Sequence, residues 1–239
     1  MPRMRDGSIV EDPRFGRLPQ VDERSLQYPI TALLEVTAAP TTRLWTLPDG
    51  APVLDQGPYG SCVGHGVTNE LRFHPYPVPA LDSKFAVERV YWPAQQIDPF
   101  PGGAYPGANP FSEGTSVLSG IKVVAKMGHY TEYRWARHEG ELALAVSQVG
   151  PAVIGVDWYA GMARPNSRGY LRPTGSVLGG HCVLVIGINT RYSYYTIYNS
   201  WGPNWGKHGT ARISRTHMAR LLDAGGDACI VTGRATPAR

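Results

Sequence analysis

A single cysteine follows a turn rich in glycine and proline, in the segment DQGPYGSC at residues 55–62. A helix is expected to begin at this cysteine, Cys62. Unpaired N–H groups and aligned peptide dipoles at a helix N-terminus stabilise a thiolate and lower the pKa of the thiol. The side-chain amide of Gln56 and the backbone N–H of Cys62 can together hold a developing oxyanion. The alternative interpretation is that Cys62 is a small buried apolar residue, as most lone cysteines are.

Two later segments carry a histidine and an asparagine. His181 opens a strand-like run in GGHCVLVIG (179–187), and Asn199 lies in YNSWGPNWG (198–206). An imidazole can act as general base and acid, and a neutral amide can orient it without titrating. Trp201 follows closely enough to shield that hydrogen bond from water. Taken singly, His181 is more simply a core histidine bonded to a carbonyl, and Asn199 a turn residue beside two core tryptophans.

Taken together and in this order, the three segments resemble those of the papain-like cysteine peptidases. The resemblance covers about residues 50–215 and includes EGTS (113–116), which is similar to the family's glycine-bearing cleft wall. It implies an α+β, two-lobed fold with an N-terminal helical lobe, a C-terminal antiparallel β-barrel-like lobe and the active-site cleft between them. It also implies the site roles: the nucleophile Cys62, the general base and acid His181, the imidazole orienter Asn199, the oxyanion donor Gln56 and the shield Trp201.

The implied reaction is hydrolysis of a peptide bond through a thioester, without a metal or a cofactor. The substrate is a peptide or a protein, and the residues expected to contact it are Gly114, Gly155, Gly180 and Trp201. The three glycines and Cys182 are small. Their size predicts a roomy pocket for a bulky apolar side chain.

Several residues differ from the family's pattern. The segment VGH (63–65) replaces Trp-Ala-Phe after the nucleophile, and Gly180 precedes the histidine where plant relatives often carry aspartate. His65 lies about one turn further along the same helix, but the histidine that opens a strand fits the family order. We therefore expect a buried packing or polar role for His65. Cys182 is expected to be a small cleft or core residue, and a disulfide bridge from it to Cys229 stays open.

The hydrophobic pattern changes period near residue 150. The elements predicted are helices at 62–73, 83–96, 115–127 and 140–149, and strands at 152–157, 182–188, 192–198, 209–213 and 228–232. Helices followed by strands are typical of α+β proteins, and two such halves commonly meet at a cleft. Three parts are expected: an extended arm (1–49), a helical lobe with the nucleophile (50–149), and a β-rich lobe with the histidine, the asparagine and a basic tail (150–239).

Six prolines interrupt the first 49 residues, so this arm cannot form the helical pro-region typical of the family. It is expected to run over the body as an extended arm or to be a disordered leader, and docking on a neighbouring subunit or a partner protein is a further expectation. A loop rich in proline and glycine at 98–112 is long enough to form a wall or a lid. The arm and this loop are the two segments expected to occlude the cleft.

Composition excludes several other classes. The 239 residues carry a net charge of +4, and their lysines and arginines are too sparse for a nucleic-acid interface. Three cysteines cannot form a disulfide framework. No apolar run is long enough to span a membrane, and the first 20 residues contain no secretory signal. A cytoplasmic or virion-associated protein, bacterial or from a phage, is expected.

Two other functions stay open from the sequence. A structural or binding protein of a phage virion or a cell envelope can use the same fold with weak or no peptidase activity. A metal site made of Cys62, His65, His181 and Cys182 is disfavoured, because paired Cys-x-x-Cys spacing is missing.

Overall fold

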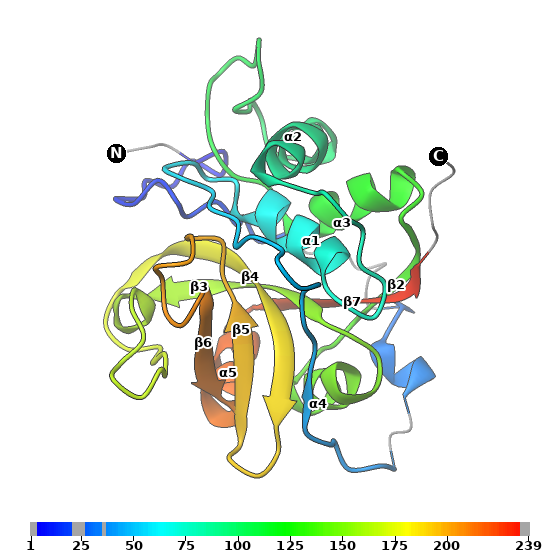
Figure 1. The fold of residues 1–239 in the computed structure, drawn as a ribbon. Coiled ribbons are helices and arrows are strands. Elements are labelled where there is room, and N and C mark those ends of the chain that lie inside the picture. Colours follow the sequence, from blue (N-terminus) through cyan, green and yellow to red (C-terminus); the bar gives the residue numbers. More distant parts are fainter. Residues whose placement is uncertain (1–3, 21–26, 35–36, 235–239) are drawn as a thin grey trace.

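One group of helices lies on one side of the molecule and a curved antiparallel sheet on the other (Figure 1). The structure is a computed structural model and describes residues 4–20, 27–34 and 37–234. Helices α1 to α3 lie above the sheet in this view, while α4 (Glu139–Gln148) and α5 (Arg215–Asp223) pack on the sheet itself. The predicted α+β, two-lobed fold is confirmed.

The upper helices surround α1 (Cys62–Arg72), which is buried along its whole length. Its neighbours are the π-helical segment η3 (Phe85–Tyr91), which continues directly as α2 (Trp92–Ile97), and α3 (Val117–Lys126). Glycines allow this close packing: a Cβ atom on Gly64 would lie 2.3 Å from the carbonyl oxygen of Ala86. The four predicted helices agree with the observed α1, η3–α2, α3 and α4 to within about two residues.

The strands pair in the order β2-β7-β3-β4-β5-β6, with β1 added beside β4, and every pair is antiparallel. Helix α1 and helix α4 both pack on β4, which explains its nearly continuous apolar run. The five predicted strands correspond to β3 through β7. The bounds are β1 (Arg43–Leu44), β2 (Tyr130–Trp135), β3 (Ala152–Tyr159), β4 (Val177–Asn189), β5 (Tyr194–Tyr198), β6 (Thr210–Ser214) and β7 (Asp227–Arg234).

Strands β1 and β2 and helix α5 were not predicted. Helix α5 begins after Ser214, whose hydroxyl accepts a hydrogen bond from the backbone N–H of His217 at 3.2 Å. It buries Met218, Leu221 and Leu222, a helical spacing within the segment that we interpreted as part of a basic tail. The proposed division at residues 49 and 149 stays a prediction, and β2 and α4, both before residue 150, contact the sheet.

Residues 4–20 of the arm lie between the upper helices and the sheet (Figure 1). Backbone N–H groups of Gly16 and Arg17 donate to the carbonyl of Gly180 on β4, each at 3.0 Å, and Leu18 N–H donates to the carbonyl of Thr115 at 2.9 Å. The expectation that the arm runs over the body is confirmed for these residues, while docking on another subunit stays a prediction. Residues Ile30–Leu33 of the arm form the 3-10 turn η2, and residues 35–36 lie outside the described residues.

One hydrophobic core extends through both lobes and includes the arm. Phe15 and Leu18 are 1% and 2% exposed, and they belong to the same buried cluster as Trp158 on β3. Burying side chains of this size stabilises a protein by roughly 1.5–3 kcal/mol each. The arm is therefore held by packing as well as by backbone hydrogen bonds.

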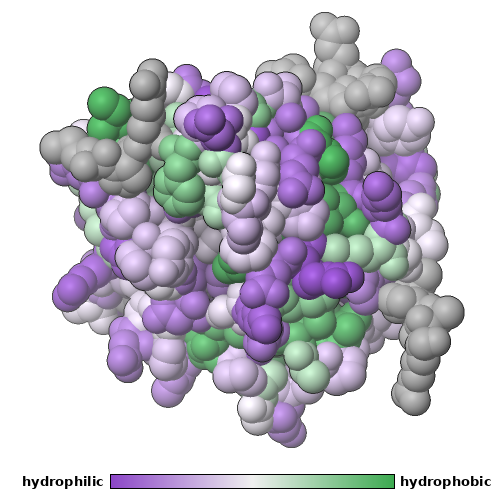
Figure 2. Space-filling model, turned by 90° about the horizontal axis from the view of Figure 1, so that it is seen from above, coloured by the Kyte–Doolittle hydropathy of each residue, from purple (hydrophilic) through white to green (hydrophobic). Residues whose placement is uncertain are grey.

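The outer surface is mixed in character. Figure 2 shows the face above the helices as largely hydrophilic, with hydrophobic residues in small separate groups. Within the described ranges, no helix has both the length and the apolar character that crossing a bilayer requires.

Candidate active site

Cys62 is the first residue of α1, as predicted, and it is completely buried. Burial raises the pKa of its thiol to about 11, although backbone N–H groups of Cys182, Gly16 and Val63 bond to the sulfur and act in the opposite direction. The expectation that the pKa of the Cys62 thiol is lowered is therefore wrong for this structure, in which the thiol is buried. One of the three donors, Gly16, belongs to the arm.

His181 and Asn199 form a buried pair. The Nε2 atom of His181 lies 2.8 Å from Oδ1 of Asn199. Because that amide oxygen can only accept, Nε2 carries a proton and Nδ1 of the neutral ring has a free lone pair. The ring centroids of Trp158 and Trp201 lie 4.8 and 4.6 Å from that of His181, and burial lowers the imidazole pKa to about 4. The tryptophan predicted as a shield thus lies directly against the imidazole.

The four predicted catalytic residues lie in one place. The N–H of Cys182, the residue after His181, lowers the pKa of the Cys62 thiol, so the thiol lies beside this part of β4, while Nδ1 of His181 has no hydrogen-bond partner among the described residues. Gln56 accepts a hydrogen bond from the hydroxyl of Ser200 at 2.8 Å, and the backbone N–H of Ser200 donates to Asn199 Oδ1 at 2.8 Å. Ser200 therefore links Gln56 to Asn199, a contact that was not predicted although this serine lies within the recognised NSWG segment.

The arm fills the groove beside these residues. The amide Nε2 of Gln56 donates to the carbonyl of Arg14 at 2.9 Å and to that of Tyr59 at 2.7 Å. The ring of Phe15 packs edge-on against His181, with a centroid distance of 5.8 Å. Gly16 passes so close to the turn before Cys62 that a Cβ atom on it would lie 1.8 Å from the carbonyl oxygen of Gly60.

All four residues predicted to contact substrate lie against this arm. A Cβ atom on Gly180 would lie 2.1 Å from the carbonyl oxygen of Arg17, and one on Gly114 would lie 3.2 Å from that of Gly16. The guanidinium carbon of Arg14 lies 4.1 Å from the ring centroid of Trp201. Gly155 faces the side chain of Arg17, while Cys182 lies beneath the groove against α1.

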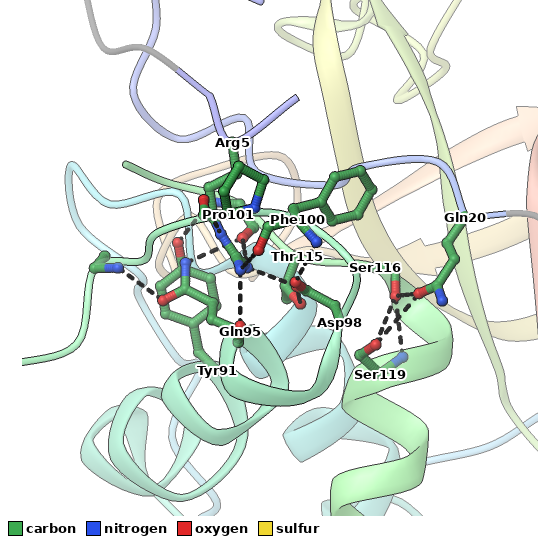
Figure 3. Close-up of polar contacts among 12 residues, drawn as sticks. Arg5, Gln20, Tyr91, Gln95, Asp98, Phe100, Pro101, Thr115, Ser116 and Ser119 are labelled. Carbon is green, nitrogen blue, oxygen red and sulfur yellow. Dashed lines mark hydrogen bonds and ion pairs between the residues drawn. The ribbon is translucent and has the colours of Figure 1, made fainter. Parts of the chain in front are cut away.

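Polar contacts fix the arm at two points, Arg5 and Gln20, on either side of the residues that cover Cys62 (Figure 3). The guanidinium of Arg5 forms an ion pair with Asp98 at 2.6 Å, and both side chains are fully buried. Arg5 also donates to the carbonyls of Gln95 at 2.7 Å and Gly114 at 3.1 Å. At the second point, the amide oxygen of Gln20 accepts hydrogen bonds from the hydroxyls of two α3 serines, Ser116 and Ser119. The base of the 98–112 loop thus holds the arm, in line with its expected role as a cleft wall.

A buried carboxyl supports the turn that carries the nucleophile. The hydroxyl of Tyr91 donates to Glu113 at 2.5 Å and accepts from the backbone N–H of Gly114 at 2.8 Å. Burial raises the pKa of Glu113, while hydrogen bonds from Tyr91 and the Gly60 amide lower it. No local sequence pattern indicates this contact, because a lone tyrosine in a helix carries no signal of its partner.

His65, Cys182 and Cys229 are the remaining residues that the sequence singled out. Nδ1 of His65 lies 3.1 Å from the carbonyl oxygen of Ser61 on its own helix, and burial lowers its pKa to about 4. This position agrees with the expected buried polar role. Cys182 and Cys229 are free and buried, so the bridge that the sequence left open is not formed.

Comparisons with known proteins agree with this geometry. The family model described as papain family cysteine protease matches residues 98–231. A gut-specific cysteine proteinase of Caenorhabditis elegans is 28% identical over 177 residues, which are 69% of this chain and 54% of the relative. A cathepsin B-like cysteine proteinase of Schistosoma japonicum is 30% identical over 107 residues, which are 39% of this chain and 31% of the relative. The chain thus spans between 31% and 54% of the length of these relatives.

Solved structures share the fold. The crystal structure of xylellain, a cysteine protease from Xylella fastidiosa, has a TM-score of 0.73 at 20% identity and covers 95% of this chain and 99% of that one. A structure from a study of the mite allergens Blo t 1 and Der p 1 has a TM-score of 0.55 at 16% identity and covers 96% of this chain and 80% of that one. Since the matching family model spans more than half of the sequence, including His181 and Asn199, the chain belongs to the papain family of cysteine proteases.

Proposed function

We propose that this chain is a cysteine endopeptidase, or a related amide hydrolase, with Cys62 as nucleophile, His181 as base and acid, Asn199 as imidazole orienter and Gln56 as oxyanion donor. The observation that carries the proposal is a peptide carbonyl held in place. The oxygen of Arg14 accepts from the Gln56 amide at 2.9 Å, and the backbone of Gly16 lies close enough to the Cys62 sulfur to lower the pKa of the thiol. A peptide backbone thus lies across the groove between thiol and amide.

Acylation starts with transfer of the thiol proton of Cys62 to Nδ1 of His181. The thiolate forms a C–S bond to the substrate carbonyl carbon, and the oxygen takes the negative charge. The amide of Gln56 and the backbone N–H of Cys62 donate to that oxygen. His181 then gives its proton to the leaving amine as the C–N bond breaks, which leaves a thioester on Cys62.

Deacylation repeats these steps with water. His181 takes a proton from the water molecule, whose oxygen bonds to the thioester carbon. The C–S bond breaks, the acid product leaves, and the proton on His181 returns to the sulfur. Throughout the cycle Asn199 keeps Nε2 protonated and the ring in one orientation, because its amide oxygen accepts at 2.8 Å without titrating.

The arm-covered chain is latent in this proposal. Burial leaves Cys62 as a thiol and His181 as a neutral imidazole at neutral pH, so the reactive ion pair is not formed. The backbone of the arm also occupies the space that a substrate needs. Activity therefore requires displacement of residues 14–17 from the groove.

The test is labelling of Cys62 by a thiol-directed epoxide, read by mass spectrometry on the full chain. Gly16→Val places a side chain against Gly60, where a Cβ atom has no room, and is expected to release the arm and raise the labelling rate at least about tenfold. Ile9→Ala, at an exposed arm position, is the matched control and should label as slowly as the wild type. Cys182 and Cys229 serve as internal controls.

Turnover completes the test. In the Gly16→Val background, adding Cys62→Ala or His181→Ala is expected to abolish cleavage of a denatured protein substrate while circular dichroism stays unchanged. Cleavage that survives Cys62→Ala would refute the assignment. Equal labelling of the three cysteines would instead favour the structural or binding role that the sequence left open. The cytoplasmic or virion-associated location and the bacterial or phage origin stay predictions.

A further inference from the structure

A deep pocket beside the thiol holds a charged side chain. The side chain of Arg17, one residue after the glycine that touches Cys62, is only 3% exposed. Its Nε and Nη2 atoms both donate to Oδ2 of Asp227, at 3.1 and 2.8 Å, and Nη2 also donates to the carbonyl of Gly225 at 2.8 Å. Nη1 lies 3.8 Å from Asp157. The pocket therefore presents two carboxylates and a carbonyl to one guanidinium.

The shape of the pocket depends on a glycine. Gly155 on β3 pairs with Asp227, the first residue of β7. A Cβ atom on Gly155 would lie 2.9 Å from both Cγ and Nε of Arg17 and 2.7 Å from Cγ2 of Val117. The space beside Asp227 thus exists because β3 carries no side chain at this point.

The charge in this pocket needs a partner. The side chain of Asp227 is 22% exposed, and burial raises its pKa while the Arg17 guanidinium lowers it. A buried carboxylate whose cation is removed is strongly unfavourable, and an apolar side chain in the pocket would leave it unpaired. When the arm leaves, a cationic side chain of the substrate restores the pairing that Arg17 provides.

We propose that this pocket makes the enzyme selective for substrates that place an arginine side chain against Asp227. The inference rests on the proposed peptidase function and names its substrate class. It replaces the prediction of a pocket for a bulky apolar side chain, which considered the glycines without the carboxylates. Arginine is favoured over lysine because two nitrogens of the planar guanidinium meet Asp227 and one of them also reaches Gly225, a geometry that one ammonium group cannot reproduce.

The first experiment measures the pocket without requiring catalysis. Arg17→Ala in the full chain empties the pocket, and ethylguanidinium at millimolar concentration is expected to raise the melting temperature of this variant more than ethylammonium does. The wild type, whose pocket is filled, and the double variant Arg17→Ala, Asp227→Asn should show no such difference. Arg17→Ala with Asp223→Asn, at an exposed aspartate on α5, is the matched control and should keep the response. An equal response to both cations, or one that persists without Asp227, would overturn the proposal.

The second experiment measures substrate choice in the same variants with a positional library of fluorogenic peptides. With the arm released by Gly16→Val, Arg17→Ala is expected to cleave peptides with arginine at one position at least about tenfold faster than those with leucine, because the buried carboxylate stays unpaired with leucine. Asp227→Asn should remove most of that preference. Cleavage that favours leucine or ignores this position would overturn the proposal. If no peptide is cleaved although the epoxide labels Cys62, the proposed peptidase function fails, and the cation experiment alone decides the character of the pocket.

Discussion

Protonation of Cys62 and His181 depends on what covers them. With the arm in place, burial raises the thiol pKa to about 11 and lowers the imidazole pKa to about 4, so both groups are neutral over the range between these values. The amides of Cys182 and Val63 belong to the body of the protein and stay against the sulfur when the arm leaves. When the arm leaves, water reaches the sulfur of Cys62 and the backbone amides of Cys182 and Val63 still stabilise its thiolate. We therefore expect the pKa of the thiol to fall.

Labelling of Cys62 is therefore expected to depend differently on pH in the covered and the released protein. Below its pKa the fraction of thiolate grows with pH, so iodoacetamide labelling of Cys62 in the wild type should still be rising at about pH 10. In Gly16→Val the rate should level off below about pH 8, because a thiol at a helix N-terminus beside an imidazole ionises early. Mass spectrometry of the Cys62 peptide gives both profiles. Superimposable profiles would show that the arm does not control the ionisation of this thiol.

Of the individual site residues, those that lie in short sequence motifs could be predicted from the sequence. Cys62, His181, Asn199 and Gln56 were found because each lies in a segment with its own local pattern. Asp227 was not found, because its role arises only where β7 pairs with β3 and faces a residue of the arm.

Among the elements, the arm behaves as a segment fixed at two points with the active site between them. Arg5 binds the base of the 98–112 loop, and Gln20 binds α3 (Figure 3). Between them, backbone hydrogen bonds connect the arm to Gly180 and Thr115. Prolines in the sequence indicated an extended segment, but its location could not be predicted, because its partners lie far along the chain and no local pattern specifies them. By contrast, α1 and β4 were predictable from their own periodicity.

The buried end of the arm gives a second prediction. Arg5→Gln leaves the Asp98 carboxylate buried without its cation, which costs about 3 kcal/mol, or roughly a hundredfold in the population of chains with an open groove. Epoxide labelling of Cys62 should speed up accordingly. Arg168→Gln, at an exposed arginine, is the control and should leave the rate unchanged. An unchanged labelling rate in Arg5→Gln would mean that residues 14–17 stay over Cys62 without the ion pair between Arg5 and Asp98.

In the whole molecule, the last described strand lies inside the sheet. Strand β7 pairs with β2 on one side and β3 on the other (Figure 1). Its end also reaches the helical lobe, where Arg234 forms an ion pair with Glu70 of α1 and donates to the carbonyl of Glu70 at 2.8 Å. The hydroxyl of Tyr130 on β2 donates to the same carboxylate. A cluster built from residues 70, 130 and 234 therefore joins the two lobes across most of the length of the chain, which no local sequence pattern could predict.

Removing one member of this cluster should destabilise the whole chain. Burial raises the pKa of Glu70, while Arg234 and Tyr130 lower it, so Arg234→Gln leaves a buried carboxylate and is expected to cost about 3–5 kcal/mol at neutral pH. Without Arg234 the pKa rises further, the native state binds a proton that the unfolded state releases, and the loss should shrink as the pH falls. Urea unfolding followed by tryptophan fluorescence measures both effects.

Two comparison variants show whether this loss comes from the unpaired carboxylate of Glu70. The double variant Glu70→Gln, Arg234→Gln removes both charges and should recover part of the stability, since no buried carboxylate is left unpaired. Arg134→Gln breaks the partly exposed ion pair with Glu132 and should cost less than about 1 kcal/mol. If Arg234→Gln proves no more harmful than Arg134→Gln, or if its deficit does not change with pH, then the packing of β7 between β2 and β3 joins the lobes without help from this charge pair.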